Sequence, residues 1–171
     1  VASSAIETTM TDKIQLISPV DGRVYAEREV ADAAQVEQAL AAAARAQASW
    51  QRRPLSERAA FCSAAVDAML SMQADIVPEL AWQMGRPVRY GAGELRGFAE
   101  RARHMIAIAP QALAAVEPEP VAGFRRYIKR DPLGTVLVVA PWNYPYLTAV
   151  NTIIPALMAG NSVILKHASQ T

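Results

Sequence analysis

Two polar residues in the last third of the sequence each follow a short run of apolar, mostly β-branched residues. Asn143 comes shortly after residues 136–139, and Lys166 ends a run at 162–165. Neither residue is explained by the strand or helix propensity of its neighbours. An asparagine amide can donate hydrogen bonds to a developing oxyanion, and a lysine supplies a positive charge. These two residues are therefore the first candidates for a functional site.

The segments around them are predicted to form a strand–helix–strand unit. Residues 136–139 suit a buried strand, and Pro145 suits the first helical position because its missing N–H would be unpaired there anyway. Residues 146–159 continue the helix, Gly160 ends it, and residues 162–165 form a second strand. Such a βαβ unit implies parallel strands joined by a right-handed crossover. Ligands of such sheets lie beyond the carboxyl ends of the strands, where both polar residues are predicted.

Each candidate also has a purely structural interpretation. A Pro-Trp-Asn-x-Pro turn would hold the Asn143 amide in place, but asparagine also commonly bonds its own turn or the next helix. Lys166 taken alone would be a solvated charge at the end of a strand. Cys62 lies within a predicted helix and is interpreted as a small buried hydrophobe, not as a nucleophile. His104 follows Arg103 on another predicted helix and is interpreted as a solvated surface residue.

Most sequence patterns that carry catalysis are absent. The chain has no G-x-G-x-x-G or G-x-x-x-x-G-K-[ST] loop to cradle a phosphate, and no G-x-S-x-G elbow. His104 and His167 are far apart and no Cys-x-x-Cys occurs, so no metal site is predicted.

Composition narrows the class of protein. The chain has 171 residues, of which 52% are hydrophobic, so a sizeable core can form. A net charge of +1 gives no reason to expect binding to nucleic acid or to an acidic membrane surface. No transmembrane run or signal peptide is recognised, and a single cysteine cannot form an internal disulfide. Together these features predict a cytoplasmic protein.

The first part of the chain is predicted to contain a β-hairpin. Residues 1–13 are small and polar and are expected to form a loosely held tail. Residues 14–18 and 23–26 flank Pro-Val-Asp-Gly, in which Asp-Gly is a strong turn signal.

Several helices are predicted to follow. Asp32 and Gln35 resemble a capping box that opens a helix running to about residue 51. Pro54 begins a second helix, which Pro78 should kink or restart and Gly85 should end. A further helix is expected from about residue 90 to residue 108, where Pro110 ends it.

The chain then enters the strand–helix–strand unit through a proline-punctuated connection. This connection lies at 117–121, and residues 124–129 are predicted as a strand of mixed exposure. The fold class is therefore α/β, with a hairpin and helices leading into the start of a doubly wound parallel sheet. Because two strands do not complete such a sheet, the sequence is expected to be an incomplete domain.

Two linked motifs resemble the aldehyde dehydrogenase superfamily. The sequence APWNYP at 140–145 resembles its P-W-N-x-P turn, and PALMAGNSVILKHASQT at 155–171 resembles the strand that follows. ISPVDGRVY at 17–25 and SWQRRPLSERAAF at 49–61 resemble the hairpin and helical entry of the family. DPLGTVLVVAPWN at 131–143 resembles the lead into its cofactor domain. The resemblance implies that residues 14–171 form the N-terminal part of a Rossmann-like NAD(P)-binding domain, with 117–132 leading to a possible oligomerisation sheet.

The resemblance also implies roles for the residues of the turn and of the second strand. Asn143 matches the asparagine whose amide helps to form the oxyanion hole. Lys166 matches the lysine that bonds the adenosine ribose. The segment that lines the nicotinamide side of the cofactor cleft is matched by Ala140, Pro141 and Trp142.

Positions that line the substrate tunnel of the family are matched by Tyr144, Leu147, Thr148 and Asn151. These four share one helical face by spacing alone. If Thr148 and Asn151 line the tunnel, a short or polar aldehyde suits it best, because unpaired buried amides are unfavourable. Alternatively, the two polar residues face other helices or solvent.

The chain departs from the family pattern near its carboxyl end. Many members have proline where this chain has His167 and glutamate where it has Ser169. A glutamate there repels the extra phosphate of NADP, whereas Ser169 can donate to it and Lys166 can attract it. We therefore expect NADP to be accepted and NAD not to be the exclusive cofactor. The catalytic cysteine, the glutamate base and the glycine motif of the family are all expected beyond Thr171.

The function implied by the resemblance is oxidation of an aldehyde to a carboxylic acid with NAD or NADP. The 171-residue chain by itself is expected to be inactive, because the nucleophile is missing. The expected partners are a small-molecule aldehyde and other copies of the chain, in a homodimer or homotetramer. Two alternatives stay open: a non-catalytic piece that serves only folding or subunit contacts, and a phosphorylating or acylating semialdehyde dehydrogenase.

Overall fold

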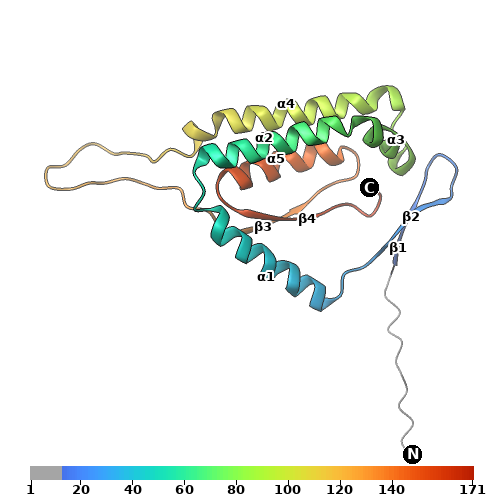
Figure 1. Cartoon of the computed structure of the whole chain (residues 1–171), viewed down its shortest axis with the longest axis horizontal. Coiled ribbons are helices and arrows are strands. Elements are labelled where there is room, and N and C mark those ends of the chain that lie inside the picture. The colour runs from blue at the N-terminus through green and yellow to red at the C-terminus, as the bar shows by residue number, and fades with distance from the viewer. Residues whose placement is uncertain (1–12) are drawn as a thin grey trace, which may run out of the picture.

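The computed structural model describes residues 13–171, which begin with an antiparallel hairpin (Figure 1). Its strands are β1 (Lys13–Ile17) and β2 (Val24–Glu29). Gly22 adopts a φ of 75°, a left-handed conformation that glycine tolerates without strain, so the Asp-Gly turn is used as predicted. Of the predicted tail, Lys13 is part of β1 and the other residues lie outside the described part of the chain.

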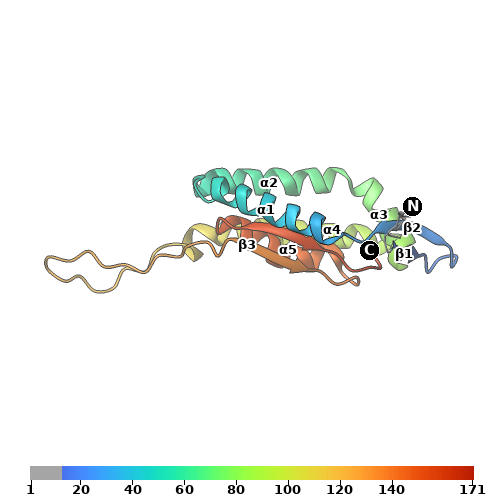
Figure 2. The same cartoon turned by 90° about the horizontal axis from the view of Figure 1, so that it is seen from below.

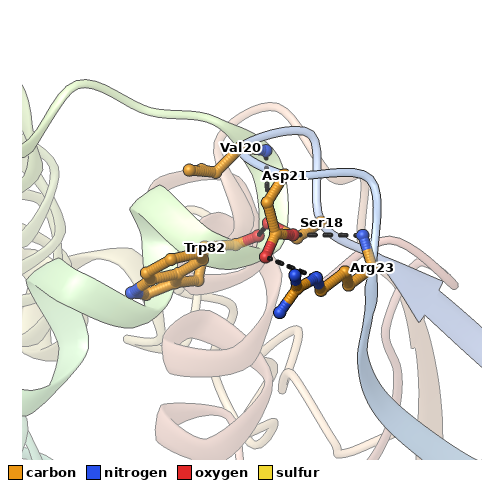
Figure 3. A network of polar contacts seen from close by, with 5 residues as sticks. All are labelled: Ser18, Val20, Asp21, Arg23 and Trp82. Atoms are coloured by element: carbon orange, nitrogen blue, oxygen red, sulfur yellow. Dashed lines mark hydrogen bonds and ion pairs between the residues drawn. The ribbon is translucent and has the colours of Figure 1, made fainter.

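Ser18 joins this hairpin to the helical part of the molecule through a hydrogen bond. Figure 3 shows its side chain beneath the turn, where the hydroxyl donates to the Trp82 carbonyl at 2.6 Å and accepts from the Val20 N–H at 3.2 Å. Asp21 closes the turn from the outside by accepting the Arg23 N–H at 3.0 Å. The Tyr25 ring also stacks on the Trp82 ring at a centroid distance of 6.1 Å.

Four helices follow: α1 (Ala33–Trp50), α2 (Leu55–Ser71), α3 (Gln73–Met84) and α4 (Val88–Ala112). The predicted capping box opens α1, because the Asp32 carboxylate accepts the Gln35 N–H at 2.7 Å while the Gln35 side chain accepts the Asp32 N–H at 3.0 Å. Gly85 ends α3 with a φ of 76°, also as predicted.

Two predictions based on prolines were wrong in position. The chain breaks at Met72 and not at Pro78, which lies inside α3, because the bend turns the buried residues Ile76 and Leu80 onto α4. Pro110 does not end α4, since the Leu113 N–H still reaches the Ala109 carbonyl at 2.9 Å. Within residues 13–171 no single helix is long and apolar enough to span a membrane; only α2 and α3 together meet that criterion, and they are bent by 70°.

The strand–helix–strand unit is formed by β3 (Thr135–Val139), α5 (Pro145–Met158) and β4 (Ser162–Lys166). The two strands are parallel and in register, with Val139 opposite Lys166. Pro145 is the first residue of α5 and Gly160 follows the helix with a φ of 92°. The predicted order and the parallel pairing are thus confirmed.

The hydrophobic core lies mainly between α2, α4 and α5. Its most buried side chains include Val66 on α2, Ala102 on α4 and Val150 on α5, and a smaller cluster joins α3 to α4 around Leu95. In Figure 1 the strands β3 and β4 lie between α5 and α1, and both helices contact them. α5 therefore packs on the helices with one side and on the sheet with another.

A long arm between α4 and β3 extends away from the rest of the molecule (Figures 1 and 2). The predicted strand at 124–129 does not form a continuous ladder in it; two isolated bridges, Val116 to Ile128 and Val121 to Phe124, are present instead. Two segments without a third strand or a covering helix make a ladder that is only marginally stable.

Candidate active site

The loop after β3 leaves the sheet at the edge where β4 also ends. The Ala140 N–H donates to the Lys166 carbonyl at 3.0 Å, so Ala140 is held against β4 and is buried. Pro141 is half-buried, whereas Trp142 keeps 47% of its surface exposed and Asn143 is exposed. The carboxyl ends of the two strands thus place the start of the predicted loop, at Ala140, against Lys166, as expected for a parallel sheet.

Glu94 on α4 binds the free N–H groups at the start of α5. Its Oε1 accepts the Tyr146 N–H at 3.0 Å and lies 3.5 Å from the Leu147 nitrogen. The Glu94 side chain is completely buried. A carboxylate at this position also interacts favourably with the positive end of the helix dipole.

Arg86, just after the end of α3, joins this carboxylate to the loop. Its Nη1 lies 2.9 Å from Glu94 Oε2, and its Nη2 donates to the Asn143 carbonyl. The guanidinium also lies over the Tyr144 ring, 4.3 Å from its centroid. Arg86 therefore holds the two residues that immediately precede α5.

The Asn143 side-chain amide itself is left without a hydrogen-bond partner among the residues described. The structural alternative, in which Asn143 bonds its own turn or caps the next helix, is not what the structure has, because Glu94 takes the free N–H groups of α5. Asn143 therefore presents an exposed donor on a loop whose backbone is fixed.

Of the residues predicted to line a tunnel, Leu147, Thr148 and Asn151 lie on α5 and Tyr144 immediately precedes that helix. Tyr144, Thr148 and Asn151 are exposed, and Leu147 is half-buried against α4 at Gly97, where a Cβ would come within 3.2 Å of Leu147 Cδ1. Asn151 borders an open hollow of about 450 Å³ between α4 and α5. Asn151 partly follows the alternative interpretation, in which it faces another helix, since its Oδ1 accepts from Arg101 Nη1 of α4 at 3.2 Å.

Lys166 and Ser169 line a second hollow, of about 270 Å³, between the hairpin and the end of β4. Arg28, Gln83 and His167 also border it, and none of the described residues that line it is a carboxylate. Burial, and then the charge of Lys166, lower the pKa of His167, so this side chain is neutral at neutral pH and adds no charge. The basic and hydroxyl groups fit an anionic or hydroxyl-bearing part of a cofactor.

Two residues that the sequence interpretation set aside lie where it placed them. Cys62 is buried, and burial raises the pKa of its thiol, as expected of a small core residue. His104 is exposed on α4.

Arg86 and Glu94 were missed from the sequence. Glu94 is a charged residue at the spacing of the buried positions Gly91, Leu95 and Ala99 of α4, and that placement was the available signal. A charge on the buried stripe of a helix needs a partner, but the sequence does not say which residue supplies it.

Comparison with known proteins decides the family, because residues 6–171 match the sequence model of the aldehyde dehydrogenase family. The chain belongs to the aldehyde dehydrogenase family. This confirms the resemblance seen in the two linked motifs.

Two relatives show how far the similarity extends along the chain. A 3-sulfolactaldehyde dehydrogenase of Pseudomonas putida is 31% identical over 154 residues, which make up 90% of this chain and 32% of that protein. An aldehyde dehydrogenase of Deinococcus radiodurans is 35% identical over 158 residues, or 90% of this chain and 30% of that protein.

Solved aldehyde dehydrogenase structures share the fold. An NAD-dependent benzaldehyde dehydrogenase from Corynebacterium glutamicum aligns at a TM-score of 0.85 and 29% identity, covering 94% of this chain and 35% of that one. An NADP-dependent glyceraldehyde-3-phosphate dehydrogenase from Bacillus halodurans, complexed with NADP, aligns at a TM-score of 0.83 and 28% identity, covering 93% of this chain and 34% of that one. The chain thus spans about a third of the length of the relatives it matches, and the predicted incomplete Rossmann-like domain is confirmed.

Proposed function

We propose that this chain is the N-terminal part of an NAD(P)-dependent aldehyde dehydrogenase that oxidises an aldehyde to a carboxylic acid. The observation that carries the proposal is the exposed, unbonded amide of Asn143 at the carboxyl edge of a parallel sheet. The family membership of the chain and the names of its relatives support the reaction class.

Asn143 is proposed to stabilise the oxygen of the aldehyde as it gains negative charge. A donor that is already in place when charge develops is more effective than water, which must reorient. The loop meets this condition, because Arg86 binds its backbone and the amide is not used elsewhere among residues 13–171. Cys62 is not proposed as the nucleophile, since it is buried and burial raises the pKa of its thiol.

Lys166 and Ser169, with the loop residues Ala140, Pro141 and Trp142, are proposed to hold the cofactor. When bound, NAD(P) supplies the acceptor for the hydride of the substrate. The hollow beside Lys166 and Ser169 suits a ribose or its phosphate, because Arg28 and Lys166 supply positive charge in an otherwise partly apolar lining and none of its described side chains is a carboxylate. We therefore propose that NADP is accepted.

Changing Ser169 to glutamate tests this cofactor proposal. In the whole protein, Ser169→Glu should lower kcat/KM for NADP relative to NAD by about 10- to 1,000-fold, since a like charge would face the phosphate. The ratio is measured with both cofactors at a fixed aldehyde concentration, with Ser169→Gln as a control of similar size without charge. The proposal is wrong if the parent enzyme already rejects NADP by more than about a hundredfold or if glutamate leaves the ratio unchanged.

A short or polar aldehyde is the proposed substrate class. Tyr144, Leu147, Thr148 and Asn151 form the proposed wall, and the exposed hydroxyl of Thr148 can bind a polar substituent, whereas the Asn151 amide is bonded to Arg101 and to the Leu147 carbonyl. A whole protein that prefers long aliphatic aldehydes by kcat/KM would contradict this proposal.

The arm between α4 and β3 is proposed to contact other copies of the chain in a homodimer or homotetramer. Phe124 keeps 73% of its surface exposed, and Tyr127 and Ile128 are exposed beside it. An apolar, incompletely paired arm of this kind gains ladder bonds and burial when a second copy supplies a strand.

Replacing Asn143 is the direct test of the proposed reaction. The whole protein should form NAD(P)H from an aldehyde, and Asn143→Ala should lower kcat by about 100- to 1,000-fold, as removal of an oxyanion donor does elsewhere. The measurement is steady-state turnover with both cofactors. A mutant with near-normal kcat would remove Asn143 from the mechanism, and a parent without turnover on any aldehyde would overturn the proposed function.

A further inference from the structure

We propose that Arg86 and Glu94 are positioning residues for Asn143: together they form a clamp that fixes the loop so that the amide points where the oxyanion forms. The inference rests on the proposed function, because it assigns these residues to the reaction step and not merely to folding. Neither residue would touch the substrate, so both would act only through Asn143.

Glu94 accounts for the free N–H groups at the start of α5. Pro145 has none, the Tyr146 and Leu147 N–H groups point at Glu94 Oε1, and the Thr148 N–H already bonds the Tyr144 carbonyl at 2.9 Å. An α-helix normally takes such a cap from the residue that precedes it. Here the cap comes from another helix, so the start of α5 is fixed relative to α4.

Arg86 links Glu94 to the loop that precedes α5. One guanidinium contacts the Glu94 carboxylate at 2.9 Å, donates to the Asn143 carbonyl and lies over the Tyr144 ring. Rotation of the peptide unit after Asn143 would break the bond to its carbonyl. The planar, five-donor guanidinium suits such a junction, because it holds several partners in a fixed geometry.

Burial of the Arg86 and Glu94 side chains makes it unfavourable to separate them. The Arg86 side chain is 11% exposed and that of Glu94 is 0% exposed, so separating the two would leave a charge without its partner away from water. The supporting helices pack closely: a Cβ at Gly91 would come within 2.8 Å of Val77 Cγ1, so α3 and α4 are in tight contact just before Glu94. The loop therefore has one favoured position.

The position of the loop matters because an amide stabilises an oxyanion only when it is placed within hydrogen-bond distance of it. A displacement of about 1 Å in a catalytic group can lower the rate by about 100-fold even when binding is unchanged. Loss of the clamp should consequently lower kcat and leave the KM values for aldehyde and cofactor largely as they were.

The test is a double-mutant cycle in the whole protein. Arg86→Met and Glu94→Gln should each lower kcat by about 10- to 100-fold with KM values within about 3-fold of the parent. In the Asn143→Ala background the same changes should lower kcat by no more than about 3-fold, because the residue they position is gone. Equal losses in both backgrounds would mean a general structural role and would overturn the proposal.

A matched control and a milder variant guard against simple misfolding. Arg58→Met removes an arginine that donates to a carbonyl at the other end of α5, so it should lower thermal stability without changing kcat at a permissive temperature. Arg86→Lys keeps the charge but cannot reach all three partners, and it should still lower kcat. A kcat loss in Arg58→Met equal to that in Arg86→Met, or full activity in Arg86→Lys and Glu94→Gln, would contradict the clamp.

Hydrogen exchange separates this inference from the proposed function. Exchange of the amides in a peptide covering 143–148 should be faster in Glu94→Gln than in the parent, whether or not an aldehyde is oxidised. Faster exchange in a protein without turnover would refute the oxidation while leaving the clamp in place. Unchanged exchange in an active enzyme would refute the clamp alone.

Discussion

Asn143 precedes α5 and Asn161 follows it, so the same side chain can be compared at the two ends of one helix. The Asn143 amide is exposed and finds no partner among the described residues. Asn161 keeps only 4% of its surface exposed and uses both sides of its amide, accepting the Gly134 N–H at 3.0 Å and donating to the Ala156 carbonyl at 3.1 Å. A polar side chain whose hydrogen bonds are complete holds the fold together, whereas one left free is available to a substrate.

The two ends of α5 are also bound by different groups from the surrounding elements. At the carboxyl end, side chains from α1 and α2 donate to the last carbonyls of α5: Trp50 Nε1 to Leu157 at 2.9 Å, Gln47 Nε2 to Gly160 at 3.2 Å and Arg58 Nε to Met158 at 3.1 Å. At the amino end, the hydrogen bonds that the buried pair of Arg86 and Glu94 makes to residues 143–147 all go to backbone groups. Both ends are therefore anchored through the backbone, and the Asn143 side chain takes no part in that anchoring.

Replacing Asn161 should have the largest effect on stability. Asn161→Ala removes both bonds of the buried amide and leaves the partly buried Gly134 N–H without its partner, which should lower the free energy of unfolding by about 2–3 kcal/mol. The midpoint of thermal unfolding measures the loss. Because Gly134 immediately precedes β3, a variant as stable as the parent would contradict the structural role given to Asn161.

Replacing Arg58 should have a smaller effect. Arg58→Met removes a charged donor from the carboxyl end of α5 and from the Gln51 and Arg53 carbonyls but keeps much of the apolar stem, so a loss of about 1–2 kcal/mol is expected. Thermal unfolding at low and at high salt measures it, and the difference from the parent should shrink at high salt because charge–dipole interactions are screened. A difference that is the same at both salt concentrations would assign the effect to packing and not to charge.

The elements that carry this comparison were predictable from sequence, because their signals are local. Pro145 fixes the start of α5, Gly160 follows its end, and Asp32 with Gln35 opens α1. Each signal involves residues within a few positions of one another, and the structure confirms them all. The motif around Asn143 also places its loop at the carboxyl edge of the sheet, where the structure has it.

The contacts and breaks that could not be predicted depend on residues that are distant in the sequence. The contacts of Arg86 and Glu94 with residues 143–147 span more than fifty positions, and Asn161 bonds a residue 27 positions away. The break between α2 and α3 is set by burial of α3 against α4, which outweighs the signal of Pro78. The strand expected at 124–129 pairs only at two isolated bridges, Val116 to Ile128 and Val121 to Phe124, and this depends on how the arm folds back on itself.

The most direct test of this account measures kcat and the thermal midpoint of the whole protein for Asn143→Ala and Asn161→Ala side by side. The account predicts a crossed result: Asn143→Ala should lose about 100- to 1,000-fold in kcat with an unchanged midpoint, and Asn161→Ala should lose stability while keeping kcat at a permissive temperature. If both substitutions lower both quantities together, or if Asn143→Ala turns over an aldehyde at a near-normal rate, the division of roles between the two ends of α5 is contradicted.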